Sequence, residues 1–245
     1  MSSKADLERL QTLVAGKGFA DALAALVAEV SPAVLTTSFS LEDQIILHMI
    51  AERRLPVRVA TLDTGRLFEA TYATHAASLQ RYPLPIETYF PDRAAVEALV
   101  QRQGPNGFFD SVDNRHACCE VRKVEPLGRA LAGARLWITG IRREHSAARQ
   151  DLGSLEWDDG RGILKFHPLF DLTWDEAKAF ATTNQVPVNP LHEQGFPSIG
   201  CAPCTRAIAP GEPMRAGRWW WETEEKKECG LHLKNGRLVR KGSEV

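Results

Sequence analysis

Three features typical of other protein classes are missing from this chain of 245 residues: long apolar runs, internal repeats and an excess of one charge. No stretch of about 18 apolar residues occurs, so the sequence offers no candidate for a membrane-spanning helix. Residues 1–10 lack the apolar core of a secretory signal peptide, and we therefore expect a cytoplasmic protein. The formal net charge of -1 gives no general electrostatic reason to bind nucleic acid or an anionic membrane.

Cysteine is also scarce, with five residues in the whole chain. Thiols stay reduced in the cytosol, which makes a disulfide framework a poor explanation for them. Cys118 and Cys119 are adjacent, Cys201 and Cys204 form a C-x-x-C pair, and Cys229 stands alone. This uneven spacing suggests four cysteines with a shared role and one with a separate role.

The sequence does contain a regular alternation of strand and helix patterns. Spaced apolar residues predict one or two helices over 5–30, with a turn at 16–18. Further along the chain, strands are expected at 33–39, 57–63, 86–90 and 134–140, and helices at 41–54, 67–80 and 92–101. This alternation predicts an α/β fold in which a doubly wound, mostly parallel sheet has right-handed crossovers.

The remaining segments are less regular. Residues 104–116 look like a loop that leads into a helix near 117–131. Thr173 and Glu176 form a capping box, which predicts a helix from residue 174 to about residue 185. Beyond Pro187 the chain is rich in proline, glycine and tryptophan, and its periodicity disappears. We expect one domain over 1–245, with a helical N-terminal region at 1–30 and an irregular segment at 187–245.

Polar residues follow the first two predicted strands, where parallel sheets bind ligands. Ser38 and Ser40 lie between a strand and a helix, where backbone N–H groups and the helix dipole can hold a phosphate. On this segment alone, an ordinary helix cap is the favoured explanation of the same residues. Asp63 and Thr64 follow the second strand and could contact a ribose, or form no more than a turn.

The two cysteine pairs are stronger candidates for a site. The C-x-x-C pair can present two thiolates to one metal, whereas the adjacent pair is too crowded to close a tetrahedral zinc chelate comfortably. A polynuclear iron–sulfur cluster removes that difficulty, because neighbouring cysteines can ligate different irons. Spacing alone leaves three interpretations open: a cluster, a structural zinc, or buried thiols without metal.

Cationic side chains gather near the cysteines and after the strand at 134–140. They are Arg115, His116, Arg122, Lys123, Arg206, Arg215 and Arg218 beside the cysteines, and Arg142, Arg143 and Arg149 after the strand. Arginine pairs bidentately with phosphate or sulfate, so the set predicts a ligand with several negative charges. A solvated charged face is the alternative.

Cys229 lies in the charged segment EEKKECGLH. Lys226, Lys227 and His232 favour its thiolate, which is the nucleophilic form, while three nearby glutamates oppose them. From these residues alone, a nucleophile and an incidental exposed cysteine are both reasonable interpretations.

Taken together, these motifs resemble one known family. The matching segments are SFSLEDQ (38–44), LDTGRLF (62–68), CCEVRKVEPL (118–127), WITGIRREHSAAR (137–149), HPLFDLTWDE (167–176), NPLHEQGFPSIGCAPCTR (189–206), GRWWWE (217–222) and ECGLH (228–232). The chain is similar over almost its whole length to the assimilatory adenylyl-sulfate reductases, which belong to the phosphoadenylyl-sulfate reductase family of PP-loop folds. The order CC, C-x-x-C and ECGLH makes a chance match hard to credit.

The resemblance implies a reaction and a cofactor. The expected activity is thioredoxin-dependent reduction of adenylyl sulfate to sulfite and AMP, in sulfate assimilation and cysteine biosynthesis. Cys229 would attack the substrate and form an S-sulfocysteine. One [4Fe–4S] cluster per chain would be held by Cys118, Cys119, Cys201 and Cys204. Residues 187–245 would then contain a cluster-binding segment and a catalytic tail.

The resemblance also suggests which residues bind the substrate. Lys123 should lie between cluster and substrate, and the loop at 38–43 replaces the pyrophosphate loop of PP-loop ATP pyrophosphatases. The candidate substrate contacts are Ser38, Ser40, Asp63, Thr64, Lys123, Arg149, Arg215, Arg218 and His232. Of these, Arg149 is the expected phosphate contact in its loop, with Arg142 and Arg143 as alternatives.

Alternative functions remain at this point. Family members with all four cysteines prefer adenylyl sulfate, but reduction of its 3′-phosphorylated form is an alternative. A tRNA-modifying PP-loop enzyme would need an SGGxDS-like loop and a basic RNA-binding appendage, and neither occurs here. A third alternative is a non-catalytic binding module whose fold is stabilised by a metal site. Whether the chain forms a homo-oligomer is left open.

Overall fold

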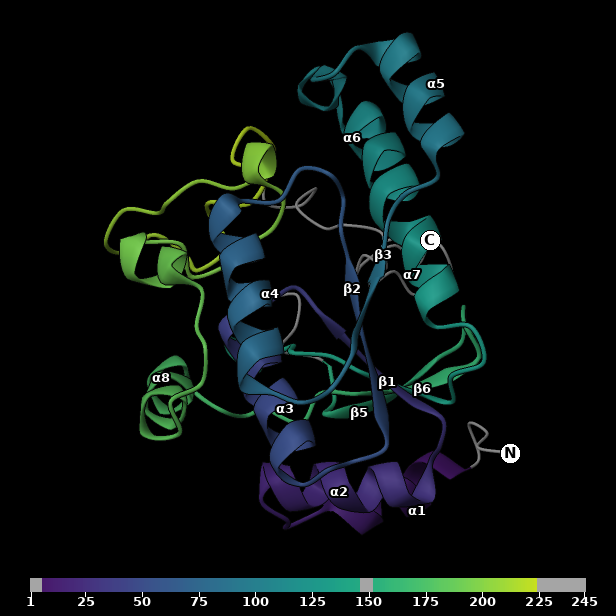
Figure 1. Cartoon of the computed structure of the whole chain (residues 1–245), viewed down its shortest axis with the longest axis vertical. Helices are drawn as coiled ribbons and strands as arrows, with labels where there is room; N and C mark the ends of the chain where they lie inside the picture. The colour runs from purple at the N-terminus through teal and green to yellow at the C-terminus, as the bar shows by residue number, and fades with distance from the viewer. Residues whose placement is uncertain (1–5, 146–151, 224–245) are drawn as a thin grey trace, which may run out of the picture.

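The fold is a six-stranded sheet with helices on both faces, seen in a computed structural model that describes residues 6–145 and 152–223 (Figure 1). The strands are β1 (Ala33–Thr37), β2 (Val57–Leu62), β3 (Ile86–Tyr89), β4 (Leu136–Ile138), β5 (Leu155–Asp158) and β6 (Ile163–Phe166). Their order is β3-β2-β1-β4-β6-β5, and every neighbouring pair is parallel except β5 and β6. The prediction of a mostly parallel α/β fold is confirmed.

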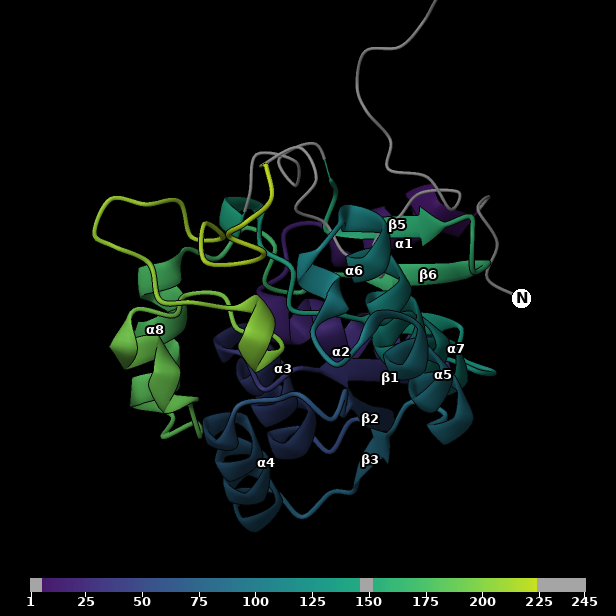
Figure 2. The same ribbon diagram turned by 90° about the horizontal axis from the view of Figure 1, so that it is seen from above.

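The helices form a layer on each face of the sheet (Figures 1 and 2). They are α1 (Leu7–Val14), α2 (Phe19–Glu29), α3 (Leu41–Glu52), α4 (Glu69–Arg81), α5 (Arg93–Gln103), α6 (Val112–Cys119), α7 (Glu125–Ala130) and α8 (Trp174–Thr183). The larger apolar core joins one face to α1, α2, α3 and α8, with Leu23, Ile46 and Ala177 as buried members. A smaller core joins the other face to α7 through Leu127 and Trp137.

Most of the predicted elements occur close to their expected positions, with three differences. The prediction of a loop over 104–116 is wrong at its end, because α6 begins at Val112 with Ser111 as its N-cap. The strand predicted at 134–140 is shorter in the structure, where β4 spans only Leu136–Ile138. The hairpin of β5 and β6 was not predicted, because its strands have four residues each and include charged side chains. The capping box of Thr173 and Glu176 is confirmed.

A π-helical turn, Glu120–Val124, connects α6 to α7. Helices with hydrogen bonds of the i to i+5 type are rare, occur mostly as single turns within α-helices and are frequent at functional sites. This turn follows the adjacent cysteines directly and contains Arg122 and Lys123. It therefore marks α6 and α7 as a place to look for chemistry.

The strand order reverses at β1. From β1 the chain builds outward through β2 and β3 on one side, and β4 starts the other side. In open parallel sheets, ligands bind outside the carboxyl ends of the strands at such a reversal. The segments after Thr37 and Ile138 therefore border the expected binding site.

Residues 184–223, after α8, form short turns, including 3₁₀ turns at Pro190–Gln194 and Ala202–Cys204, and one isolated β-bridge between Thr205 and Arg218. Backbone hydrogen bonds fix this segment to the rest of the fold, such as the bond from Ala202 N–H to the carbonyl of Arg66. None of the helices in 6–145 and 152–223 has the length and apolar character needed to cross a bilayer.

Candidate active site

A cavity of about 210 Å³ opens at the carboxyl ends of β1 and β4, where the strand order reverses. Hydroxyl-bearing side chains, three cations and the segment 197–200 line it. The hydroxyl-bearing residues are Thr36, Thr37, Ser38, Ser40, Thr64, Thr71, Thr139 and Ser198. Because hydroxyl groups donate and accept hydrogen bonds, this lining suits a ligand with many oxygen atoms.

The loop between β1 and α3 has a fixed, unusual conformation. Phe39 adopts a φ of 59°, which is uncommon outside glycine. The amide and hydroxyl of Ser38 both donate to Oδ2 of Asp43, over 2.6 and 2.8 Å. Burial raises the pKa of Asp43 to about 6, although the hydrogen bonds from Ser38 lower it. Ser38 therefore lines the cavity with both of its donors already engaged.

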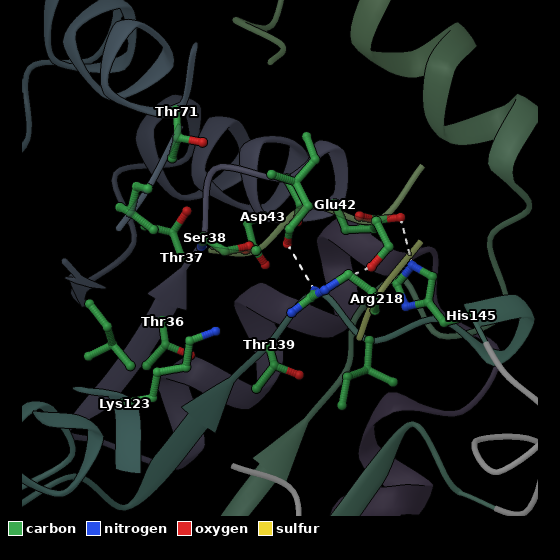
Figure 3. A pocket seen from close by; sticks show the side chains of 18 of the residues that line it. Thr36, Thr37, Ser38, Glu42, Asp43, Thr71, Lys123, Thr139, His145 and Arg218 are labelled. Atoms are coloured by element: carbon green, nitrogen blue, oxygen red, sulfur yellow. Dashed lines mark hydrogen bonds and ion pairs between the residues drawn. The ribbon is translucent and has the colours of Figure 1, made fainter. Parts of the chain in front are cut away.

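Glu42 forms a second buried network beside Asp43 (Figure 3). Its Oε1 accepts from Nε of Arg142 at 2.8 Å and lies 3.0 Å from Nε2 of His145. Burial alone would raise the pKa of Glu42, but His145 and Arg142 outweigh it and hold the pKa well below its usual range. Glu42 is therefore a charged member of a neutralised network.

Gly140 lets β4 approach this first turn of α3 closely. A Cβ atom there would overlap Oδ1 of Asp43 and lie only 2.8 Å from Cβ of Glu42. The position therefore accepts no side chain unless the acidic pair moves.

Three cations line the same cavity: Lys123, Arg215 and Arg218. Figure 3 shows Lys123 and Arg218 on opposite sides, with their charged ends directed toward the space between them. The guanidinium of Arg218 is held by the carbonyl of Ile199 at 3.2 Å and lies over the ring of Trp219. The cavity is therefore prepared for an anionic group at this end.

Four cysteines line a second, smaller cavity, which shares Lys123 and Trp219 with the first. They are Cys118, Cys119, Cys201 and Cys204, and none of them forms a disulfide. Arg66, Arg115 and Arg122 line this cavity as well. Within 6–145 and 152–223, no three His, Cys, Asp or Glu side chains converge on a point in the way that a single metal ion requires.

The four thiols have different electrostatic surroundings. Burial raises the pKa of Cys204 to about 12, with a further increase from the neighbouring Cys201 thiolate. Burial also acts on Cys201, but Lys123 and the hydroxyl of Thr64, 3.2 Å from its sulfur, outweigh it and lower its pKa. The charges around the cavity thus favour at least one thiolate.

The structure places most, but not all, of the predicted substrate contacts around one cavity. Ser38, Ser40, Thr64, Lys123, Arg215 and Arg218 line it. Asp63 is not in its lining, because its carboxylate turns to Gly65 N–H and the hydroxyl of Tyr72. Arg149, Cys229 and His232 lie outside the described residues.

Several of the other predicted cations have structural partners. Arg142 is fully buried by its pairs with Glu42 and Glu144. Arg143 pairs with exposed Asp171. Arg206 pairs with Glu212 and lines neither cavity.

One feature of the cavity wall was not predicted. Oγ1 of Thr139 lies 2.6 Å from Nδ1 of His167, whose Nε2 lies 3.6 Å from a carboxylate oxygen of Glu156. A histidine in HPLFDL was the only available signal, since Glu156 belongs to the hairpin that was missed. These contacts fix the orientation of the Thr139 hydroxyl at the cavity.

Comparison with known proteins agrees with this arrangement. The model of the phosphoadenosine phosphosulfate reductase domain matches residues 32–207. The chain is 49% identical over 232 residues to the adenosine 5′-phosphosulfate reductase of Sinorhizobium fredii. The aligned region covers 95% of this chain and 92% of that protein. It is 51% identical over 204 residues to the enzyme of that name from Allochromatium vinosum, and this alignment covers 83% of this chain and 80% of that protein.

Solved structures show the same fold. A phosphoadenylyl-sulfate reductase from Candida auris, solved as a phosphate complex, superposes with a TM-score of 0.73 and 26% identity, covering 85% of this chain and 98% of that one. An FMN adenylyltransferase from Candida glabrata shares only the fold, with a TM-score of 0.55 and 14% identity over 98% of this chain and 81% of that one. From the domain match and the curated relatives, the chain belongs to the phosphoadenosine phosphosulfate reductase family.

Proposed function

We propose that this chain reduces adenylyl sulfate to sulfite and AMP in the cytoplasm, with thioredoxin as electron donor, as a step of sulfate assimilation toward cysteine. The observation that carries the proposal is the position of Lys123, which lines both the cation-rich cavity and the cavity of the four cysteines. The relatives from Sinorhizobium fredii and Allochromatium vinosum, named for adenosine 5′-phosphosulfate, support this substrate.

The cations of the larger cavity suit the phosphosulfate group. Lys123, Arg215 and Arg218 would contact its oxygens and offset the repulsion between this anion and an attacking thiolate. Ser40 and Thr64 would contribute hydroxyls to the same ligand. We propose Arg149 and His232, which lie outside the described residues, as further anion contacts.

Cys229 is the proposed nucleophile. Its thiolate attacks the sulfur of adenylyl sulfate, the bond between that sulfur and the bridging oxygen breaks, and AMP leaves with the electron pair. A thioredoxin thiolate then attacks Sγ of the S-sulfocysteine, and sulfite leaves as the S–S bond breaks. The second thioredoxin thiol resolves the mixed disulfide, so the thioredoxin dithiol supplies the two electrons.

We propose that Cys118, Cys119, Cys201 and Cys204 hold one [4Fe–4S] cluster. The donor set fits, because the described residues that line one cavity include four thiols and no other metal ligand. The adjacent pair can ligate different irons. Arg115 and Arg122 would offset the negative charge of the thiolates. When bound, such a cluster supplies a fixed iron–sulfur centre beside the cations of the substrate cavity.

The test is sulfite release by one anaerobic preparation, with reduced thioredoxin and either adenylyl sulfate or its 3′-phosphorylated form. We expect a clear preference for adenylyl sulfate. Cys229→Ser should abolish sulfite release while the protein keeps a brown chromophore and its iron and sulfide content. A colourless protein with one zinc would contradict the cluster.

The main alternative is reduction of the 3′-phosphorylated substrate. It is favoured by the Candida auris structure, whose protein is named for phosphoadenylyl sulfate. Higher kcat/KM for that substrate in the same assay would establish it instead. A metal-stapled binding module without catalysis would give no sulfite from either substrate.

A further inference from the structure

Two exposed aromatic side chains from distant parts of the chain meet on the surface. Phe109 belongs to the 3₁₀ turn before α6, and Trp220 lies near the end of the described residues. They are 40% and 39% exposed, and their ring centroids are 6.2 Å apart. Single exposed apolar residues are ordinary, whereas contiguous exposed apolar patches mark interaction sites. We call Phe109 and Trp220 the aromatic patch.

Buried contacts hold the aromatic patch in place. Phe109 packs on Phe108 and Trp221, with centroids 4.5 Å from each, and Phe108 lines the cysteine cavity. Two residues after Trp220, the carboxylate of Glu222 accepts two hydrogen bonds from Arg115 of α6, at 3.0 and 2.7 Å. The side chains of this pair are only 1% and 4% exposed. The patch is therefore a preorganised surface, which lowers the entropy cost of binding.

The covalent chain limits how far Cys229 can be from this patch. Cys229 lies six positions after Thr223, so their Cα atoms are at most about 22 Å apart in any conformation. A standard protein interface covers about 800 Å² on each partner, a disc roughly 30 Å across. A protein that reacts with Cys229 can therefore place its footprint over or beside the end of the described chain.

We infer that the aromatic patch of Phe109 and Trp220 is a docking surface for the reductant protein, a dithiol protein with an apolar surface around its reactive thiols. This inference rests on the proposed function, because it requires a sulfur-bearing Cys229 that a second protein must reach. Aromatic residues, Trp above all, are enriched among the side chains that dominate interface energies. The patch binds the partner while the neighbouring cysteine cavity and the substrate cavity keep their own contacts.

The experiment separates docking from chemistry. The holoenzyme is prepared unsubstituted, as Phe109→Ala with Trp220→Ala, and as Leu79→Ala. Leu79 is a matched control, because it is 49% exposed on α4 and belongs to no aromatic contact with the patch. Three rates are measured: incorporation of sulfur-35 from adenylyl sulfate in a single turnover, release of labelled sulfite by dithiothreitol, and release by varied reduced thioredoxin.

We expect the double variant to lose about tenfold in kcat/KM for thioredoxin, while labelling and release by dithiothreitol stay within twofold of the unsubstituted protein. Leu79→Ala should change none of the three rates. Unchanged thioredoxin kinetics in the double variant would overturn the docking surface and leave the proposed function standing. No labelling of the unsubstituted protein would instead overturn the proposed function.

Two other occupants of the patch give different results. If the chain's own C-terminal segment covers it, the double variant will lose labelling rate as well as thioredoxin-dependent release. If a second copy of the chain covers it, the double variant will sediment at a lower mass than the unsubstituted protein. Either result would overturn the assignment to the reductant.

Discussion

Replacing Asp43 by asparagine should stabilise the protein at neutral pH, and the gain should shrink in acid. The carboxyl group of Asp43 is buried, and burial raises its pKa from 3.8 to about 6. The native state therefore binds a proton more tightly than the unfolded chain, and keeping the carboxylate charged costs free energy. Asparagine has nearly the same shape, and its oxygen can still accept from the amide of Ser38.

The size and sign of the effect follow from linkage between protonation and folding. A folded pKa above the unfolded value means that the free energy of unfolding falls as pH rises from 3.8 through about 6. The cost of the charged Asp43 is then about 3 kcal/mol at pH 7.5 and about 2 kcal/mol at pH 5. The advantage of Asp43→Asn over the unsubstituted protein should thus shrink by about 1 kcal/mol between pH 7.5 and pH 5.

Urea unfolding of both proteins at several pH values between 5 and 7.5 measures this difference, and other titrating groups cancel in the comparison. Asp110→Asn is the control, because it removes the same charge from an exposed position and should change stability by no more than about 0.5 kcal/mol. A difference between Asp43→Asn and the unsubstituted protein that stays constant with pH, or grows in acid, would refute the reasoning.

Neutralising Glu222 as Glu222→Gln leaves the charge of Arg115 buried, so the free energy of unfolding should fall by about 3 kcal/mol or more in chemical denaturation. The same change at Glu212, whose ion pair with Arg206 is partly exposed to solvent, should cost less than about 1 kcal/mol. Equal costs for the two variants would contradict the argument. Gly140→Ala should displace the two carboxylates at the start of α3 and lower kcat/KM for sulfite release by on the order of a hundredfold. Gly128→Ala is its control, because a Cβ there meets no atom within 4 Å, and similar losses in both variants would rule out the steric explanation.

The sheet and most helices could be predicted because their patterns are local. Five-residue and six-residue strands such as β1 and β2 are buried and bounded by helix patterns, which fixes their type. The hairpin of β5 and β6 carries Glu156 and Lys165 in its strands, and these become acceptable only through neighbours. Lys165 lies over the ring of Trp137, a contact that no local pattern shows.

The candidate site was predictable where residue type and spacing alone indicate a chemical role. Four cysteines in two pairs indicated a common site, and they line one cavity. The acidic pair Glu42 and Asp43 gave no such signal, because a carboxylate beside an anion site looks unfavourable. The charge of Glu42 is acceptable there because Arg142 and His145, about 100 residues further along the chain, neutralise it. Such long-range compensation depends on the tertiary fold.

The π-helical turn Glu120–Val124 has a consequence for the spacing of side chains around the helix axis. In an α-helix, a residue five positions on points to a different side, whereas hydrogen bonds of the i to i+5 type return it to the same side. Cys118 and Lys123 can therefore both face the cysteine cavity although they are five residues apart. Deleting one residue of the turn would rotate α7 by about 100° relative to α6. A single extra residue thus sets the phase between the thiols and the cation that adjoins them.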